Sequence, residues 1–174
     1  VDPRTGKQLG LATGDPRDFS SFDELYDAFK KQTGYFVGLL AKAQHICWQV
    51  RREYYSLPFT SALTDDCLSR GLSGAAGGER YPQLYYGFDD RGHQNVANSL
   101  AAIKKLVYEE KKISMPELLE TLAANFEGKQ GLQQMLLAAP KYGNDDDYVD
   151  EIHDDLSLWI QRRMAEENPV LGTS

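Results

Sequence analysis

Hydrophobic residues recur at three- and four-residue steps along most of the chain, which predicts a mainly helical fold. The longest run predicts one helix over about residues 22–55. Ser21 and Glu24 form a capping box at its start, with the hydroxyl group bonding forward and the carboxylate reaching back. Gly34 and Gly38 interrupt the run, and we expect them to mark close packing and not a break.

Shorter helices are predicted after this one. Pro58 suits a helix start and Gly71 suits a left-handed C-cap, which predicts a helix over residues 59–70 with Phe59, Ala62, Leu63, Cys67 and Leu68 on its apolar face. Asn95 is the predicted N-cap of a helix that ends near Glu110. The remaining helices are predicted from Ser114 to Gly128, from Leu132 to Ala138, and from the acidic residues 144–147 through Ile160.

One segment has a different pattern. The tyrosine-rich run over residues 81–86 is bounded by glycines and suits a half-buried β-strand, which a flexible connector over residues 72–78 precedes. A single strand cannot satisfy its own backbone hydrogen bonds, so we expect its partners to lie outside this sequence. The ends of the chain, Val1 and the loop-like residues 168–174, lead to the same expectation. The predicted fold class is mainly α with one clear strand, within a larger sheet protein.

Composition limits the classes of function. A net charge of -7 and a pI near 5.0 argue against nucleic acid, because no basic stripe is present to neutralise phosphates. No stretch approaches the roughly 20 apolar residues of a membrane span, and no signal peptide opens the chain, so we expect no membrane association and a cytoplasmic location. Cys47 and Cys67 lack metal-ligand spacing and are predicted to be buried, reduced cysteines.

The acidic run over residues 144–155 raises a metal hypothesis. Asp150 and His153 are three residues apart on the predicted helix, as metal-ligand pairs can be. The acids spread around the helix, however, and the run lacks the glycine and terminal glutamate of a calcium loop. We therefore favour a capped, solvated helix and predict no metal site. Trp48 and Trp159 are predicted to be core residues.

Several motifs stand in an order that resembles the glycyl radical enzymes related to pyruvate formate-lyase. They are Thr13-Gly14-Asp15-Pro16, Phe22-Asp23-Glu24-Leu25, Pro58-Phe59, Ser61-Ala62-Leu63, Asp65-Asp66-Cys67, Gly77-Gly78 with Arg80-Tyr81, the run over residues 98–107 and the run over residues 139–146. Each motif is weak alone, but the ordered set covers nearly the whole chain.

The resemblance implies a segment of a ten-stranded α/β barrel, with residues 1–174 as the central part of an incomplete barrel domain. In such enzymes a cysteine and a glycyl radical meet inside the barrel. The radical is installed by a separate activating enzyme that uses S-adenosylmethionine and an iron–sulfur cluster. The Gly-Cys-x-Glu and Arg-Val-x-Gly-Tyr-like loops that carry these residues do not occur in this sequence. We therefore expect no catalytic residue and no bound cofactor in this segment, and we do not expect Cys67 to be the radical cysteine.

The same resemblance implies a radical-based lyase, decarboxylase or dehydratase of anaerobic metabolism. Its expected partners are a small-molecule substrate, the remainder of the barrel, the activating enzyme and a second copy in a homodimer. The end of the tyrosine-rich strand would face the substrate cavity, which predicts Asp89, Arg91, Tyr86 and His93 as substrate contacts. An acid beside aromatic side chains favours an aromatic substrate. The same residues also suit a loop stabilised by an Asp89–Arg91 ion pair, with His93 as a polar loop residue.

A second hypothesis is a free-standing helical module that binds a partner and performs no chemistry. A stable, cooperatively melting monomer would favour the module. A barrel segment would instead aggregate or associate through its unpaired strand edge.

Overall fold

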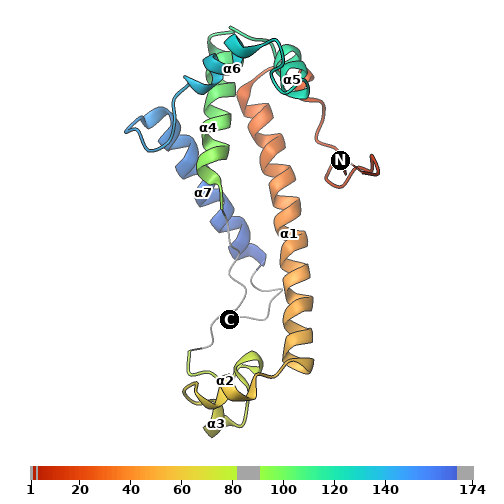
Figure 1. The fold of residues 1–174 in the computed structure, drawn as a ribbon, viewed down its shortest axis with the longest axis vertical. Coiled ribbons are helices and arrows are strands. Elements are labelled where there is room, and N and C mark those ends of the chain that lie inside the picture. The colour runs from red at the N-terminus through yellow and green to blue at the C-terminus, as the bar shows by residue number, and fades with distance from the viewer. Residues whose placement is uncertain (1, 3, 82–90, 168–174) are drawn as a thin grey trace. The chain divides into compact units, whose positions relative to one another are not determined.

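The computed structural model describes residues 2, 4–81 and 91–167 of the 174-residue chain. The chain divides into two compact units. Unit 1 comprises residues 1–36 and 90–163, and unit 2 comprises residues 37–89 and 164–174. The ribbon is built from helices and connecting loops in the part that is described (Figure 1).

The elements follow one another along the chain. They are η1 (Pro16–Asp18), α1 (Phe22–Tyr54), α2 (Pro58–Ala62), α3 (Cys67–Arg70), η2 (Gly74–Ala76), α4 (His93–Ile103), the π-helical turn η3 (Lys104–Glu109), α5 (Met115–Ala123), α6 (Gln130–Leu137) and α7 (Asp147–Glu167). No helix among the described residues combines the length and the apolar character needed to cross a bilayer.

The long first helix is confirmed. Ser21 Oγ accepts a hydrogen bond from the Glu24 backbone N–H at 3.2 Å, as the capping box predicts. The Glu24 carboxylate reaches one residue further back than expected and accepts the Ser20 N–H at 2.7 Å. Gly34 is buried, and a Cβ atom there would meet the Trp159 ring at 3.5 Å. This glycine therefore marks close packing of α1 against α7 within unit 1.

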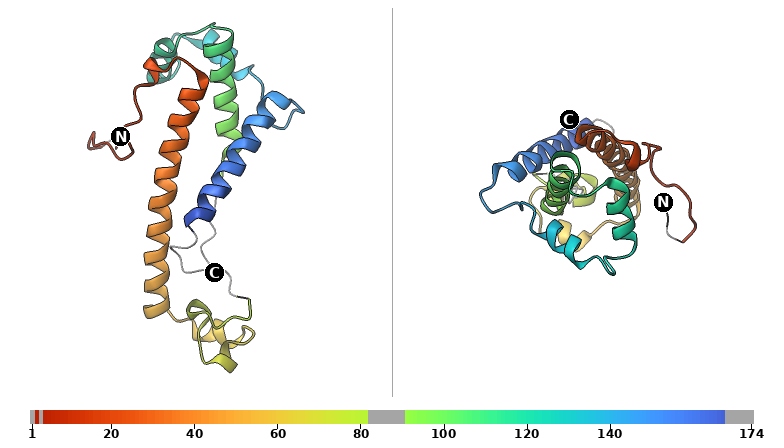
Figure 2. Two further views of the ribbon diagram at one scale, coloured as in Figure 1. Left: turned by 180° about the vertical axis from the view of Figure 1, so that it is seen from behind. Right: turned by 90° about the horizontal axis from the view of Figure 1, so that it is seen from above.

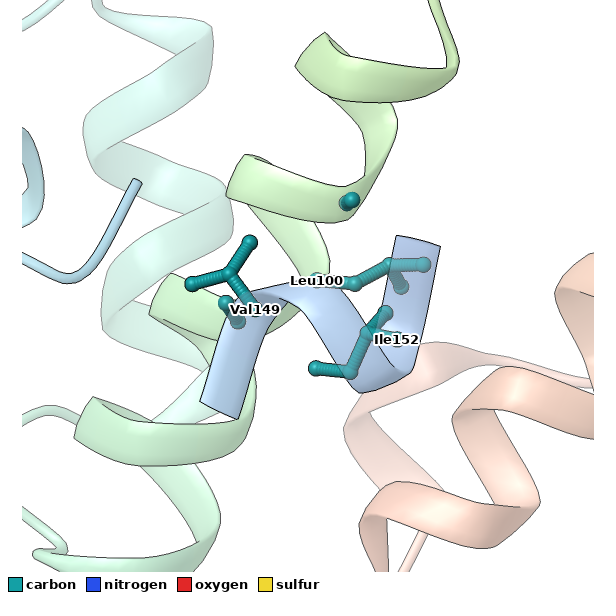
Figure 3. Close-up of a cluster of buried hydrophobic side chains, with 5 residues drawn as sticks. Leu100, Val149 and Ile152 are labelled. Atoms are coloured by element: carbon teal, nitrogen blue, oxygen red, sulfur yellow. The ribbon is translucent and has the colours of Figure 1, made fainter. Parts of the chain in front are cut away.

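The core of unit 1 is formed mainly by α4 and α7, which lie side by side (Figures 1 and 2). Val149 and Ile152 of α7 point toward Leu100 of α4 (Figure 3). Ala97 and Ala101 are fully buried in the same cluster. Small residues on α4 let the two helix backbones approach closely, so the branched side chains of α7 fill the space between them.

A second cluster lies at the end of unit 1 where α1 begins, together with α5 and α6 (Figure 2). Its buried members are Leu106, Ile113, Met115 and Leu118. Ser114 caps α5 by accepting the Glu117 N–H at 3.3 Å, which confirms the second capping box. The helix ends at Ala123 and not at Gly128, because the chain turns through left-handed residues at Asn125 and Phe126.

An ionic contact joins α1 to α7 inside unit 1. The Asp155 carboxylate accepts hydrogen bonds from Lys30 Nζ at 2.7 Å and from Tyr26 Oη at 2.9 Å. These bonds, chiefly the one from Lys30, lower the pKa of Asp155. Because the Asp155 side chain is 58% exposed, water screens the pair and its worth is less than about 1 kcal/mol.

Replacing Asp155 with asparagine is expected to lower the free energy of unfolding by less than about 1 kcal/mol at pH 7. A carboxylate with a lowered folded pKa contributes above its unfolded pKa of about 3.9 and loses that contribution as the pH falls through the folded pKa. The variant and the wild type should therefore converge in urea midpoint at acid pH. Glu151→Gln, at an exposed position of the same helix, is the control. A difference that persists at low pH would contradict this account.

Unit 2 contains the residues that were predicted as one helix over 59–70. The helix is broken into α2 and α3, because Asp66 adopts a left-handed φ of 74° between them. Gly71 follows α3 with a φ of 64°, which confirms the predicted left-handed C-cap. The predicted apolar face is largely wrong: Cys67 is buried, whereas Phe59 is 79% exposed and Leu68 is 74% exposed.

Two of the motifs quoted for the family meet in unit 2. The Arg80 guanidinium donates to both carboxylate oxygens of Asp66, at 2.9 and 3.1 Å, and lies 3.3 Å from Asp65. The Arg80 backbone N–H also donates to the Asp65 carbonyl oxygen at 3.1 Å. These hydrogen bonds hold residues 79–81 against the start of α3 and lower the pKa of Asp66.

The prediction of one clear strand is wrong. Residues 79–81, where the strand was expected to start, form a bend, and no strand occurs in the described ranges 4–81 and 91–167. The bonds from Arg80 to Asp66 direct this segment toward α3, where no extended neighbour lies. The rest of the expected strand falls in residues 82–90, outside the described residues. The regular structure of the described chain is all helical, so a missing strand partner no longer indicates a larger sheet protein.

The cysteine and tryptophan predictions are confirmed only in part. Cys67 is 2% exposed, and its burial, with the nearby Glu79 carboxylate, raises the pKa of its thiol. Cys47, in contrast, is exposed on α1. Trp48 and Trp159 are both half-buried and do not belong to either buried cluster.

Candidate functional site

The predicted substrate contacts divide into two pairs. Tyr86 and Asp89 lie outside the described residues. Arg91 is exposed and lies two residues before His93, which is half-buried and is the first residue of α4. The described part of the predicted site therefore lies where α4 begins.

Helix α4 begins two residues before the predicted N-cap, Asn95. Gly92 precedes the helix with a left-handed φ of 93° and, as a glycine, supplies no side-chain cap to the first turn. The Val96 N–H already donates to the Gly92 carbonyl oxygen at 3.1 Å. Glycine adopts this φ without steric cost, so the sharp turn can be made there and His93 becomes a helical residue and not a loop residue.

His93 contacts α7. Its Nδ1 atom lies 3.3 Å from Ser157 Oγ, across 64 residues of sequence. A serine hydroxyl group can donate or accept, so this contact suits either neutral tautomer of the imidazole ring. The His93 ring also lies 6.3 Å from the ring of His153, one turn earlier on α7. The first residue of α4 therefore bonds to Ser157 of another helix and lies near His153 of the same helix.

The loop before α7 completes the arrangement. The Tyr142 ring lies 4.1 Å from the His153 ring, and the Tyr142 backbone N–H donates to Asn98 Oδ1 on α4 at 2.7 Å. His153 Nδ1 lies 3.2 Å from the Asp154 carboxylate. We call His93, Tyr142, His153 and Ser157 the histidine cluster. It links the start of α4, the middle of α7 and the loop between α6 and α7.

Sequence reasoning identified His93 but missed Ser157 and Tyr142. Serine on a helix carries no signal of its own, and Tyr142 drew attention only as part of the motif over residues 139–146. His153 was considered only as a metal ligand with Asp150. Within the described residues, no group of three or more histidine, cysteine, aspartate or glutamate side chains has the geometry to hold a metal ion.

A second feature of unit 1 is an open pocket of about 340 Å³ between the start of α1 and η3. It is lined by Ser20, Ser21, Phe22, Asp23, Lys104, Tyr108, Glu109 and Lys111. Lys104 Nζ lies 4.0 Å from Glu109 and 4.8 Å from the centre of the Tyr148 ring. Because this cation already faces an acid and an aromatic ring, the pocket is a weaker candidate than the histidine cluster.

Comparison with known proteins identifies the class first: the sequence and the fold are those of a segment of the glycyl radical enzymes. The chain belongs to the pyruvate formate lyase-like family, whose sequence model matches residues 1–173. The resemblance drawn from the ordered motifs is thereby confirmed.

Individual relatives agree with this family. The chain is 40% identical to trans-4-hydroxy-L-proline dehydratase of Clostridioides difficile over 152 residues, which are 87% of this chain and 19% of that protein. It is 41% identical to isethionate sulfite-lyase of Oleidesulfovibrio alaskensis over 170 residues, 95% of this chain and 20% of that protein. The crystal structure of hydroxyproline dehydratase from Clostridioides difficile with bound substrate superposes with a TM-score of 0.81 at 36% identity, covering 93% of this chain and 20% of that one. The chain thus spans about a fifth of the length of the relatives it matches.

Proposed function

We propose that this chain works as an internal segment of a glycyl radical enzyme with lyase or dehydratase activity. One observation carries the proposal: the family model matches residues 1–173, yet these residues span only about a fifth of the relatives. The cysteine and glycine that react would lie on polypeptide outside residues 1–174. The same match favours the enzyme over the free-standing binding module.

Exposed apolar side chains on unit 2 support the role of a segment. Large apolar residues of this unit that are exposed include Leu39, Leu40, Ile46, Val50, Tyr54, Phe59, Leu63 and Leu68. Tyr54 is 75% exposed and Ile46 is 59% exposed. Large exposed apolar surfaces are rare on soluble monomers, so we propose that the remainder of the barrel covers these side chains.

Further parts of the proposal come from the family alone. A separate activating enzyme that uses S-adenosylmethionine and an iron–sulfur cluster would place the radical on glycine. The full-length enzyme would act as a homodimer in the cytoplasm. The closed interior of the full-length enzyme would keep water and dioxygen away from the reacting carbon atoms.

The substrate class can be proposed from the entry of α4. The substrates named for the two relatives, trans-4-hydroxy-L-proline and isethionate, each carry a hydroxyl group and an anionic group. Arg91 can bind a carboxylate or sulfonate through its planar guanidinium group. We propose that Arg91 and His93 contact a small hydroxylated anion, together with Tyr86 and Asp89. The aromatic substrate expected from the tyrosine-rich run stays a prediction.

The test uses the longer protein that contains this segment. After anaerobic activation with its activating enzyme and S-adenosylmethionine, electron paramagnetic resonance should show an organic radical. Isethionate, trans-4-hydroxy-L-proline and the aromatic probe 4-hydroxyphenylacetate are then assayed separately. We expect turnover of one of the two non-aromatic hydroxylated anions, isethionate or trans-4-hydroxy-L-proline. Arg91→Ala should raise its KM roughly tenfold while Arg91→Lys raises it less, because lysine keeps only the charge.

The control is Arg17→Ala, which removes an exposed arginine bonded to Asp15 and should leave KM unchanged. Failure to form any radical would refute the proposed enzyme class. Turnover of the aromatic probe alone would refute a small non-aromatic hydroxylated anion as the substrate and favour an aromatic one.

A further inference from the structure

We propose that Ser157 and His153 of α7 are positioning residues that hold His93, and through it the backbone from which Arg91 projects. The contact between Ser157 and His93 is a feature of the fold, whereas its effect on substrate binding rests on the proposed function. Neither residue needs to touch the substrate. Their role is to set where the entry of α4 lies.

The entry of α4 needs such support. The N-cap residue, Gly92, has no side chain to cap the first turn and has a left-handed φ of 93°. A glycine at this point leaves the chain more conformational freedom than any other residue would. A Cβ atom on Gly92 would meet no atom of the described residues within 4 Å, so their packing does not restrict the turn from that side. Among the described residues, the side chains that follow this turn provide fixed points.

Two such points lie on α4. His93 Nδ1 is 3.3 Å from Ser157 Oγ, and Asn98 Oδ1 accepts the Tyr142 N–H at 2.7 Å. The Tyr142 ring in turn lies 4.1 Å from the ring of His153 on α7. The two attachments are five residues apart on α4, and both lead to the five-residue stretch of α7 from His153 to Ser157. Together with the apolar packing of Ala97, Leu100 and Ala101 against α7, these two attachments set where the entry of α4 lies.

The cluster is separate from the core that gives α7 its stability. The buried residues of α7 are Val149, Ile152, Leu156 and Ile160. Ser157 is half-buried and adds one hydroxyl group beside that apolar row. Removing the hydroxyl group leaves no large cavity, so Ser157→Ala tests positioning with little change in packing.

Arg91 is two residues from His93, so a small displacement of the helix entry moves its guanidinium group as well. Bidentate binding of an anion depends on geometry, and displacements of about 1 Å are costly at such sites. Loss of the Ser157 contact should therefore weaken substrate binding and leave the radical chemistry intact. We therefore expect KM to rise while kcat changes little.

The experiment compares Ser157→Ala with Ser157→Thr, which keeps the hydroxyl group, in the full-length enzyme. Ser99→Ala is the matched control, because Ser99 is exposed on α4 and donates to the Asn95 carbonyl oxygen of its own helix at 2.8 Å. Hydrogen–deuterium exchange is read from peptides covering residues 91–95. KM and kcat are measured with whichever of isethionate and trans-4-hydroxy-L-proline the enzyme consumes.

We expect Ser157→Ala to speed exchange at residues 91–95 and to raise KM roughly fivefold with kcat within about twofold, the effect of losing one hydrogen bond. Ser157→Thr should restore both values. In the double variant Ser157→Ala/His153→Ala, KM should rise by less than the product of the two single increases, because both residues support the same helix entry.

Several outcomes would overturn the proposal. Exchange in Ser157→Ala that matches Ser99→Ala would show that the contact does not hold the helix entry. Faster exchange with an unchanged KM, or an equal loss in the threonine variant, would remove the positioning role. Failure to consume either anion would refute the proposed substrate class and not this contact, and the exchange comparison with its threonine rescue would then decide the contact alone.

Discussion

Replacing Leu156 with alanine is expected to lower the free energy of unfolding by about 3 kcal/mol, since deleting a buried leucine side chain removes its transfer free energy and leaves a cavity. Leu156 is 1% exposed and is one of the two largest fully buried side chains of the described chain. For a protein of this size the loss corresponds to a melting temperature lower by roughly 6–12 °C. Differential scanning calorimetry or thermal circular dichroism measures it.

Leu158→Ala provides the matched control. Leu158 is on the same helix, two residues further on, and is 51% exposed. The same chemical change at this position should cost less than about 1 kcal/mol, because much of the side chain is already in water. Equal losses at the two positions would mean that α7 does not bury the face described above.

Replacing Gly78 with alanine is expected to destabilise unit 2 by about 3 kcal/mol, the upper part of the range for overpacking. Gly78 is buried, and an added Cβ atom would lie 2.8 Å from the Leu72 carbonyl carbon, with the carbonyl oxygen closer still. Backbone atoms cannot move aside as a flexible side chain can. Hydrogen–deuterium exchange in peptides from residues 58–78 should report the loss of protection.

The neighbouring glycine, Gly77, provides a control position at which an added Cβ atom has room. Gly77 has a left-handed φ of 84°, but a Cβ atom there would meet nothing within 4 Å. Gly77→Ala should therefore cost only about 1 kcal/mol, the conformational penalty of a left-handed alanine. A larger loss at Gly77 than at Gly78 would contradict the close approach of the Leu72 carbonyl group.

Local signals in the sequence were sufficient for the long helix and its caps. The apolar spacing of α1 and the hydroxyl groups of Ser21 and Ser114 act within a few residues, so the sequence shows both partners. The left-handed turn at Gly71 is another local choice. Such features depend little on what the rest of the chain does.

The errors arose where distant residues decide the local backbone. The strand prediction rested on the aromatic run, but the Arg80–Asp66 bonds, 14 residues apart, turn the described part of that segment into a bend. The helix over residues 59–70 is broken at Asp66. Local propensity along the sequence indicated neither the Arg80–Asp66 bonds nor the helix break at Asp66.

The candidate site likewise contains residues that could be predicted from the sequence and residues that could not. His93 and Arg91 were predicted because the family resemblance directs attention to the segment before α4. Ser157 is 64 residues from His93, and only the packing of α4 on α7 brings the two together. Its role could not be inferred from a sequence in which it is one of several helical serines.

The bonds between Arg80 and the acids at positions 65 and 66 also affect how this segment can be engineered. A chimera should exchange residues 65–66 and residues 77–81 together, although the two stretches are separated in the sequence. A chimera that takes the first stretch from one parent and the second from another would inherit an arginine without its acceptors, or acids without their donor. Recombination junctions in this region are therefore best placed outside residues 65–81.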